Sequence, residues 1–273
     1  MSAISDSGKT YRNECTGEAL ATVQKHSGPQ DIVLFGSCFC PFVQRVWVAF
    51  EYLRIPYQYY EVDPYKKPQD LLEISPKGLV PGLKLNQYHP PRSLNESTVI
   101  VEYLEDLAKS ASNRSLLPTD PYARGLVRLQ VDHINRTLAP AFYRFLQAQE
   151  PESQVTTGRE FHDALEGLVS LLERGKREIV STSGTAGAGE AATLRKGLGL
   201  YFGDGDLGLT DVMAGPSLPR LQLPAFDKLF KDPHFRCTCS TEDLYLDSYE
   251  RYAYNRPNTS QVADAINSGR GLP

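Results

Sequence analysis

The pattern of apolar positions changes near residue 115, and each half of the chain has its own period. In the first half, short apolar runs alternate with stretches of helical spacing. The run 32–35 lies between Asp31 and Gly36 and is typical of a buried strand. By the same reasoning we expect strands at 32–35, 57–62, 79–85 and 93–94, and helices at 42–53, 68–74 and 97–109.

This order, β-α-β-α-β-β-α, predicts an α/β domain with one parallel strand pair followed by an antiparallel hairpin. Residues 1–29 are polar and end in Gly-Pro, so we expect a loose N-terminal extension. The predicted α/β domain then covers 30–110. A polar linker that contains proline follows this domain. After it we expect an all-helical second domain over 118–273.

Apolar residues of the second half recur at steps of three and four, which indicates amphipathic helices. The steps over 127–145 predict one long helix, kinked at Pro140. A second helix is predicted over 161–172. The stretch 181–192 is rich in Ser, Thr, Gly and Ala and is predicted to be a loop, and the last dozen residues are expected to fray.

A short helix is predicted to begin at Gly208. Asp211 stands three residues later, where its carboxylate can accept from the first N–H groups of the helix. Leu207 and Val212 have the spacing of a hydrophobic staple across the same start. Glycine is a tolerable N-cap but offers no side-chain oxygen, so this start is weaker than one with Ser or Thr.

The composition and charge argue against two classes of function, nucleic-acid binding and membrane insertion. The chain has 29 Lys and Arg against 33 Asp and Glu, a net charge of −4, so no basic surplus favours nucleic acid. The longest charge-free stretch, 32–44, has 13 residues and is too short to span a bilayer. The first ten residues have no signal-peptide core. We therefore expect a cytoplasmic protein with no nucleic-acid or membrane partner.

Cys40 is the candidate nucleophile. It lies between a predicted strand and a helix that opens with Pro41, so it stands at the helix N-cap. Free N–H groups there favour a thiolate and lower a thiol pKa. The alternative is a buried structural cysteine. Val43 occupies the fourth position of a Cys-x-x-Cys motif, where a second cysteine would stand. Cys40 is therefore suited to a mixed disulfide with an external thiol.

The other cysteines give no clear metal site. Five cysteines without an export signal do not indicate a disulfide framework. The pairs Cys38 with Cys40 and Cys237 with Cys239 together offer four thiolates. Each pair has one intervening residue, whereas zinc sites more often use two to four, so we expect no metal.

Three further motifs suit a small peptide ligand. Pro81 opens a strand, and the peptide bond between Val80 and Pro81 is a candidate for the cis form. A cis bond here would leave the preceding main-chain N–H and C=O free to pair with an extended peptide. The alternative is an ordinary trans proline in a loop. Ser97 at a helix start can hold a carboxylate and Glu96 an ammonium, although a simple helix cap fits as well. Lys67 can pair with a second carboxylate or be a solvated charge.

Together these residues resemble the glutathione transferase superfamily, and within it the omega class of fungal type. The resemblance is strong over 31–125 and only architectural beyond. It rests on ordered motifs, each of them weak alone: Phe39-Cys40-Pro41-Phe42 with Arg45, Lys67-Pro68, Gly78-Leu79-Val80-Pro81, Glu96-Ser97 with Ile100 and Glu102-Tyr103-Leu104, and Leu116-Leu117-Pro118 with Asp120-Pro121-Tyr122.

The resemblance implies a thioredoxin-like N-terminal domain, an all-α C-terminal domain and a homodimer. It implies glutathione as co-substrate and a second pocket for small hydrophobic or aromatic molecules. It also implies the residue roles. These are Cys40 as catalytic thiol, Phe39 beside the thiol, the Val80 main chain with cis Pro81 on the cysteinyl part of glutathione, Glu96 and Ser97 on the γ-glutamyl end, and Lys67 on the glycyl carboxylate.

Three functions are compatible with this resemblance. The first is a thiol transferase in which Cys40 takes glutathione from a mixed disulfide or a glutathionyl-ketone. The second is a carrier of aromatic or polyphenolic ligands with weak catalysis, to which 15 Tyr and 11 Phe lend support. The third is an interaction module on the same fold. The full set of ligand residues around Cys40 argues against the third.

Overall fold

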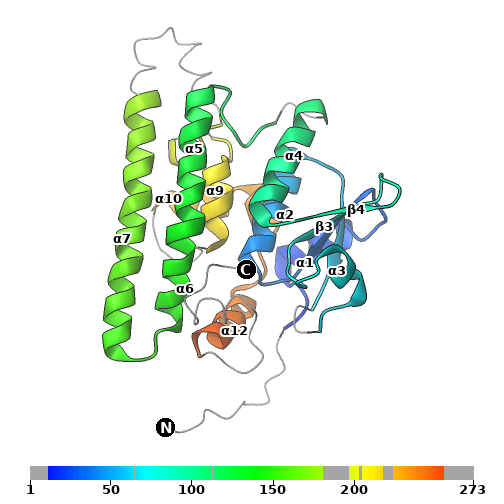
Figure 1. Ribbon diagram of the computed structural model, residues 1–273, viewed down its shortest axis with the longest axis horizontal. Helices are drawn as coiled ribbons and strands as arrows, with labels where there is room; N and C mark the ends of the chain where they lie inside the picture. The colour runs from blue at the N-terminus through cyan, green and yellow to red at the C-terminus, as the bar shows by residue number, and fades with distance from the viewer. Residues whose placement is uncertain are drawn as a thin grey trace.

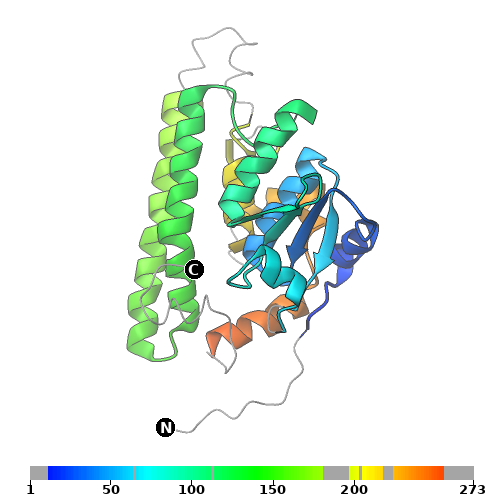
Figure 2. The same ribbon diagram turned by 45° about the vertical axis from the view of Figure 1, so that its right-hand side comes forward.

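The computed structural model describes residues 12–63, 66–111, 114–180, 197–202, 205–217 and 224–254. An α/β part packs against a set of long helices (Figure 1). The rotated view shows the two parts side by side, with the longest helices on the outer side of the molecule (Figure 2).

A four-stranded sheet forms the centre of the α/β part, in the order β2-β1-β3-β4. Strand β1 runs parallel to β2 and antiparallel to β3, and β4 completes an antiparallel hairpin with β3. The predicted mixed sheet is confirmed. The third strand begins at Gly82 rather than at residue 79, since Pro81 has no N–H to donate to a ladder. The strand bounds are β1 Ile32–Gly36, β2 Gln58–Glu61, β3 Gly82–Leu85 and β4 Arg92–Asn95.

Alternate side chains of β1 enter two different cores, as strand geometry requires. Leu34 joins the main core with α2 (Pro41–Leu53) and α4 (Ser97–Ala111), which pack on each other. Val33 and Phe35 join a smaller cluster with α3 (Gln69–Ile74) on the opposite face. The sheet is therefore covered on both sides, which is the arrangement of a thioredoxin-like domain.

The N-terminal extension is not a loose lead-in where the structure describes it, so that prediction is wrong. Helix α1 (Gly17–Lys25) forms there and packs against the C-terminal segment. The Ala19 N–H donates to the carbonyl of Cys239 at 3.1 Å, and the Thr22 hydroxyl donates to the carbonyl of Cys237 at 2.7 Å. The buried positions of α1 are Ala and Thr, which give little apolar signal.

The long helix predicted over 127–145 is confirmed as three consecutive helical segments. Helix α5 (Pro121–His133) passes into a π-helical turn η1 (Ile134–Leu138) and then into α6 (Ala139–Gln147). The wide turn ends two residues before Pro140, a residue without an N–H for the helical ladder. Helix α7 (Pro151–Gly175) contains the second predicted helix.

The predicted helix start at Gly208 is also confirmed. Helix α9 (Leu209–Ala214) follows Gly208, whose N–H donates to Oδ2 of Asp211 at 2.9 Å. Predictions for 181–192 and for the last dozen residues lie outside the described residues. The remaining segments are η2 Lys176–Val180, η4 Leu200–Phe202, η5 Gly215–Ser217, α10 Pro224–Lys231, α11 Pro233–Arg236 and α12 Glu242–Ala253.

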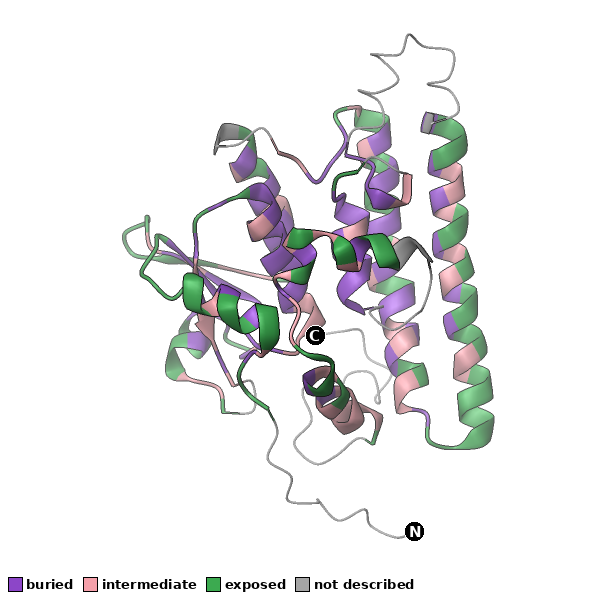
Figure 3. Ribbon diagram, turned by 180° about the vertical axis from the view of Figure 1, so that it is seen from behind, coloured by how far each residue is buried: buried purple, intermediate pink, exposed green. Residues whose placement is uncertain are grey.

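Helix α2 is the element shared by the two parts of the molecule. Its residues 43–50 are all buried, and it packs against α4, α9, η5 and α11. Seen from behind, buried positions gather where these helices meet, and exposed positions lie on the outer helices (Figure 3). The fold is thus a thioredoxin-like domain followed by a mostly helical region. No helix of the described ranges is long and apolar enough to cross a membrane.

Candidate active site

Cys40 stands at the N-cap of α2, as its sequence position predicts. Its backbone is extended, with φ −78° and ψ 117°, and Pro41 is the first helical residue. The Gln44 N–H donates to the Cys40 carbonyl at 3.1 Å and closes the first turn. Cys40 therefore stands at the end of a rigid strand–helix junction, and the residue as a whole is half-buried.

The Val80–Pro81 peptide bond is cis, as predicted. The turn that contains it leads directly into β3 and faces the start of α2. The Cys40 thiol donates to the Val80 carbonyl, with 3.8 Å between sulfur and oxygen. The fold thus brings the candidate nucleophile next to the main-chain groups expected to bind a peptide. A second cis bond, His89–Pro90, lies in the β3–β4 turn and was not among the predictions.

Glu96 and Ser97 form the third part of the site, at the start of α4. Glu96 has φ 70°, a left-handed conformation that costs a non-glycine residue about 1–3 kcal/mol. Its carbonyl accepts from the Ile100 N–H at 2.9 Å, so it occupies the N-cap position. The Glu96 side chain is exposed, whereas Ser97 is buried. The strained turn presents both side chains at a helix start.

One pocket of about 460 Å³ joins these segments. Four predicted ligand residues line it: Val80, Pro81, Glu96 and Ser97. Cys40 borders it through its contact with Val80. Phe39, which was predicted to lie beside the thiol, packs against the main core and is not part of the lining.

Lys67, the predicted partner of the glycyl carboxylate, is not part of the pocket lining. Its Nζ donates to the carbonyl of Lys77 at 3.1 Å, and Lys77 is the lysine that lines the pocket. The Lys67 side chain passes close to Gly78, which has φ 64° and where a Cβ would collide with it. Lys77 was not predicted as a site residue, although its place two residues before Leu79-Val80-Pro81 is a local signal for it.

Burial dominates the ionisation of Cys40 and raises the pKa of its thiol. Hydrogen bonds from the N–H groups of Val43 and Phe42 act against this, as does the positive charge of Arg45. The predicted lowering of the Cys40 pKa is therefore wrong for this structure. A helix N-cap can be read from the sequence, but the apolar surroundings that outweigh it come from distant segments.

Cys38 has less exposed surface than Cys40, and its surroundings also disfavour a thiolate. Burial, with a further contribution from the Glu61 carboxylate, raises its pKa to about 12. Its thiol donates to the carbonyl of Arg12 at 3.7 Å, away from the pocket. Cys38 is thus a poor substitute for Cys40 as the working thiol.

Arg45 and Asn135 line the same pocket, and neither was predicted as a ligand-binding residue. Arg45 is 1% exposed, and its Nη1 donates to Oδ1 of Asn135 at 2.9 Å. Asn135 belongs to η1, so this bond joins the helical region to the thioredoxin-like domain. The only sequence signal for Arg45 is its fixed distance from Cys40 in the motif at the helix start.

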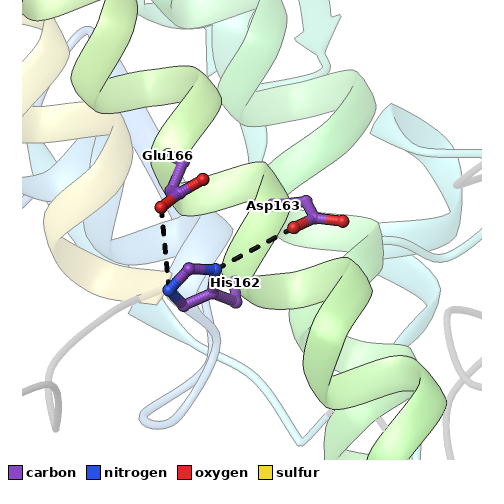
Figure 4. Close-up of side chains that lie close together, drawn as sticks. All are labelled: His162, Asp163 and Glu166. Atoms are coloured by element: carbon purple, nitrogen blue, oxygen red, sulfur yellow. Dashed lines mark ion pairs between the residues drawn. The ribbon is translucent and has the colours of Figure 1, made fainter.

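A cluster of possible metal ligands, His162, Asp163 and Glu166, lies on the exposed face of α7 (Figure 4). Asp163 faces Nδ1 of the ring and Glu166 faces Nε2, each at 3.9 Å. Because one imidazole offers a single nitrogen to an ion, the two long contacts form no shared ion site; they are ion pairs only when the ring is protonated. It has no part in the pocket.

Comparison with known proteins agrees with this geometry. The N-terminal domain model of glutathione S-transferases matches residues 34–112. Glutathione S-transferase U8 of Arabidopsis thaliana is 30% identical over 195 residues, which are 71% of this chain and 82% of the relative. Glutathione S-transferase omega-1 of Mus musculus is 26% identical over 166 residues, 59% of this chain and 65% of the relative.

A solved structure matches most of the chain. Glutathione transferase Omega 3C of Trametes versicolor has 32% sequence identity and a TM-score of 0.67, and the match covers 90% of this chain and all of that one. The cysteine at the helix start, the cis proline turn and the Glu-Ser helix start thus occur within a shared fold. The chain belongs to the glutathione S-transferase family.

Proposed function

We propose that the protein is an omega-type, glutathione-dependent thiol transferase with Cys40 as nucleophile. The observation that carries this is the 3.8 Å contact between the Cys40 sulfur and the Val80 carbonyl, beside the cis Pro81 turn. A thiol in this place reaches the sulfur of a glutathione whose cysteinyl part pairs with Val80. The omega-class relatives among the comparisons support the same assignment.

Each end of glutathione has a partner of suitable chemistry among the residues that line the pocket. The γ-glutamyl ammonium suits the Glu96 carboxylate, and its α-carboxylate suits Ser97 and the N–H groups at the start of α4. The glycyl carboxylate suits a lysine. We assign it to Lys77, which lines the pocket, with Lys67 as a second cation held against Lys77.

The proposed reaction has two thiol–disulfide exchanges. The Cys40 thiolate attacks the glutathione sulfur of a mixed disulfide, forms a Cys40–glutathione disulfide and expels the substrate thiolate. A second glutathione thiolate attacks that disulfide, releases glutathione disulfide and restores Cys40. The proton that Cys40 loses before the first attack is taken up by the leaving thiolate, and the N–H groups of Phe42 and Val43 hold the transient anion.

The direct test is turnover of the mixed disulfide of glutathione and 2-mercaptoethanol. We expect Cys40→Ser to lower the rate by about a hundredfold or more, since a serine hydroxyl cannot form the mixed disulfide. Cys38→Ala is the matched control, because this thiol lies two residues away but faces Arg12. We expect it to keep most of the rate. Full activity of Cys40→Ser would contradict the assignment.

One observation favours a second function, the carriage of aromatic or polyphenolic ligands. Because burial raises the Cys40 pKa, the thiol is mostly protonated at neutral pH. The pocket wall also contains apolar groups, Phe42 and Leu79. A carrier would bind an aromatic dye with micromolar affinity in both the wild type and Cys40→Ser, and neither protein would turn over the mixed disulfide. Dimerisation and a cytoplasmic location stay predictions.

A further inference from the structure

Arg45 is a buried cation near the start of α2, the helix whose N-cap is Cys40. It is 1% exposed, and burial lowers its pKa to about 10, so it stays positively charged at neutral pH. None of the ion pairs among the described residues includes Arg45. Because no carboxylate of those ranges neutralises this charge and solvent scarcely reaches it, its field on nearby groups is only weakly screened.

The guanidinium of Arg45 reaches back over the first turn of the helix. Long side chains of a helix lean towards its N-terminus and lie over the preceding turn. Arg45 does so, since its Cζ lies 4.8 Å from the ring centroid of Phe42, three residues earlier. Cys40 begins that same turn, and its carbonyl accepts from the Gln44 N–H. The positive charge and the thiol are therefore close enough for each to act on the ionisation of the other.

Asn135 orients this cation from the helical region. Nη1 of Arg45 donates to Oδ1 of Asn135 at 2.9 Å. Nε and Nη2 of Arg45 make no hydrogen bond within the described ranges, so the contact with Asn135 sets the orientation of the guanidinium. Nδ2 of Asn135 donates to the Thr98 hydroxyl at 3.0 Å, which fixes the amide in turn. Asn135 lies in the π-helical turn η1, and such turns are frequent at functional sites.

The other titratable groups near the thiol carry no buried charge. Tyr143 of α6 acts on both Cys40 and Arg45, but burial raises its pKa well above the ordinary value, so it is neutral at neutral pH. Glu96 and Lys77 line the pocket that Cys40 borders, have opposite charges and are both exposed. Among the described residues, the effect of Arg45 on Cys40 is therefore the one that water screens least.

We propose that Asn135 is a positioning residue for the Cys40 thiolate and acts through Arg45. The inference rests on the proposed function in taking Cys40 as the nucleophile. Negative charge develops on its sulfur when the thiol loses its proton, and again when the second glutathione expels it from the mixed disulfide. A fixed cation stabilises both states without gaining or losing a proton itself. Because Asn135 belongs to the helical region, the docking of that region controls the reactivity of the thiol.

The alkylation rate of Cys40 tests this without turnover. A pKa shift of one unit changes the thiolate fraction tenfold, but a more basic thiolate is also more nucleophilic, so the rate at neutral pH changes about threefold. Asn135→Asp places a carboxylate against Nη1 and neutralises Arg45. We expect it to lower the rate of iodoacetamide labelling of the Cys40 peptide by about threefold or more. A merely structural loosening would expose Cys40 and raise this rate, so the sign of the change separates the two roles.

Arg136→Gln is the matched control for charge. It also lowers the net charge by one beside Asn135, but Arg136 is exposed and pairs with Asp132. Its labelling rate should stay close to that of the wild type, since solvent screens an exposed charge. A rate of Asn135→Asp equal to or above that of Arg136→Gln would overturn the proposal.

Asn135→Leu tests whether the effect passes through Arg45. This variant removes the acceptor of Nη1 without adding a charge, and the labelling rate should again fall. In the Arg45→Gln background the same substitution should have no further effect, which a double-mutant cycle measures. Equal effects of Asn135→Leu in both backgrounds would contradict the proposal.

Turnover of the mixed disulfide, measured beside labelling, separates this proposal from the proposed function. If the wild type does not turn over the mixed disulfide but Asn135→Asp still lowers the labelling rate of Cys40, only the transferase is contradicted. If the wild type does turn it over and Asn135→Asp leaves the labelling rate unchanged, only the role of Asn135 is contradicted.

Discussion

At the level of single residues, the helix N-cap position of Cys40 and its burial shift the pKa of its thiol in opposite directions. The N–H groups of Phe42 and Val43 and the charge of Arg45 favour the thiolate, while the apolar surroundings favour the thiol and dominate. The first effect is local and can be read from Pro41 and the helix that follows. The second depends on how remote segments pack, so the sequence could not predict its size.

The alkylation rate of Cys40 should therefore keep rising with pH. A raised pKa means that the reactive thiolate becomes abundant only above the range of an ordinary cysteine, so the rate should still increase beyond pH 9. We would measure iodoacetamide labelling of the Cys40 peptide by mass spectrometry from about pH 6 to about pH 10. Arg45→Gln should move the rise to higher pH. A plateau already reached at neutral pH would contradict this assignment.

Four of the six residues predicted as glutathione ligands line the pocket, and their sequence signals are contiguous motifs. Val80 with Pro81 and Glu96 with Ser97 are adjacent pairs whose backbone geometry follows from proline and from a helix start. Arg45 is different, since its partner Asn135 lies 90 residues away. Such a pairing follows only from the docking of the two parts of the molecule.

At the level of elements, the start of α9 is tied to a preceding segment by one carboxylate. Oδ2 of Asp211 accepts from the N–H of Gly208 at 2.9 Å and from the N–H of Leu200 at 2.8 Å. The sequence predicted the first bond, because it lies within one helical turn. It could not predict the second, which fastens η4 to α9 across a loop.

Removing this carboxylate should weaken the helical region. We expect Asp211→Ala to lower the free energy of unfolding by about 1–2 kcal/mol, since a cap is lost and two main-chain donors lose their acceptor. Urea unfolding followed by circular dichroism measures this. Asp206→Ala, at an exposed carboxylate five residues earlier, should stay within about 0.5 kcal/mol of the wild type. Equal losses in both variants would refute the role of the cap.

Helix α1 is an element that hydrophobic periodicity alone does not predict. Its buried residues, Ala19 and Thr22, are small and carry almost no hydrophobic signal. Its stability comes from contacts with Cys237 and Cys239, more than 200 residues away. A short helix that depends on such tertiary contacts is marginal by propensity, and its sequence is typical of an unstructured extension.

At the level of the whole molecule, the two ends of the described chain close on each other, and the pocket lies where the two parts meet. Arg236 pairs with Glu18 at 3.0 Å, which adds to the docking of α1 on the C-terminal segment. Arg45, Thr98 and Asn135 come from α2, α4 and η1. Alternation and helical spacing predicted both parts of the fold, whereas their docking depends on pairs that no local pattern reveals.

The central claim is that Cys40 forms a mixed disulfide with glutathione. The most direct measurement is the intact mass of the protein after incubation with glutathione disulfide, for wild type, Cys40→Ser and Cys38→Ala. We predict one glutathione adduct on the wild type and on Cys38→Ala, removed by reductant, and none on Cys40→Ser. No adduct on the wild type, or the same adduct on Cys40→Ser, would contradict the claim.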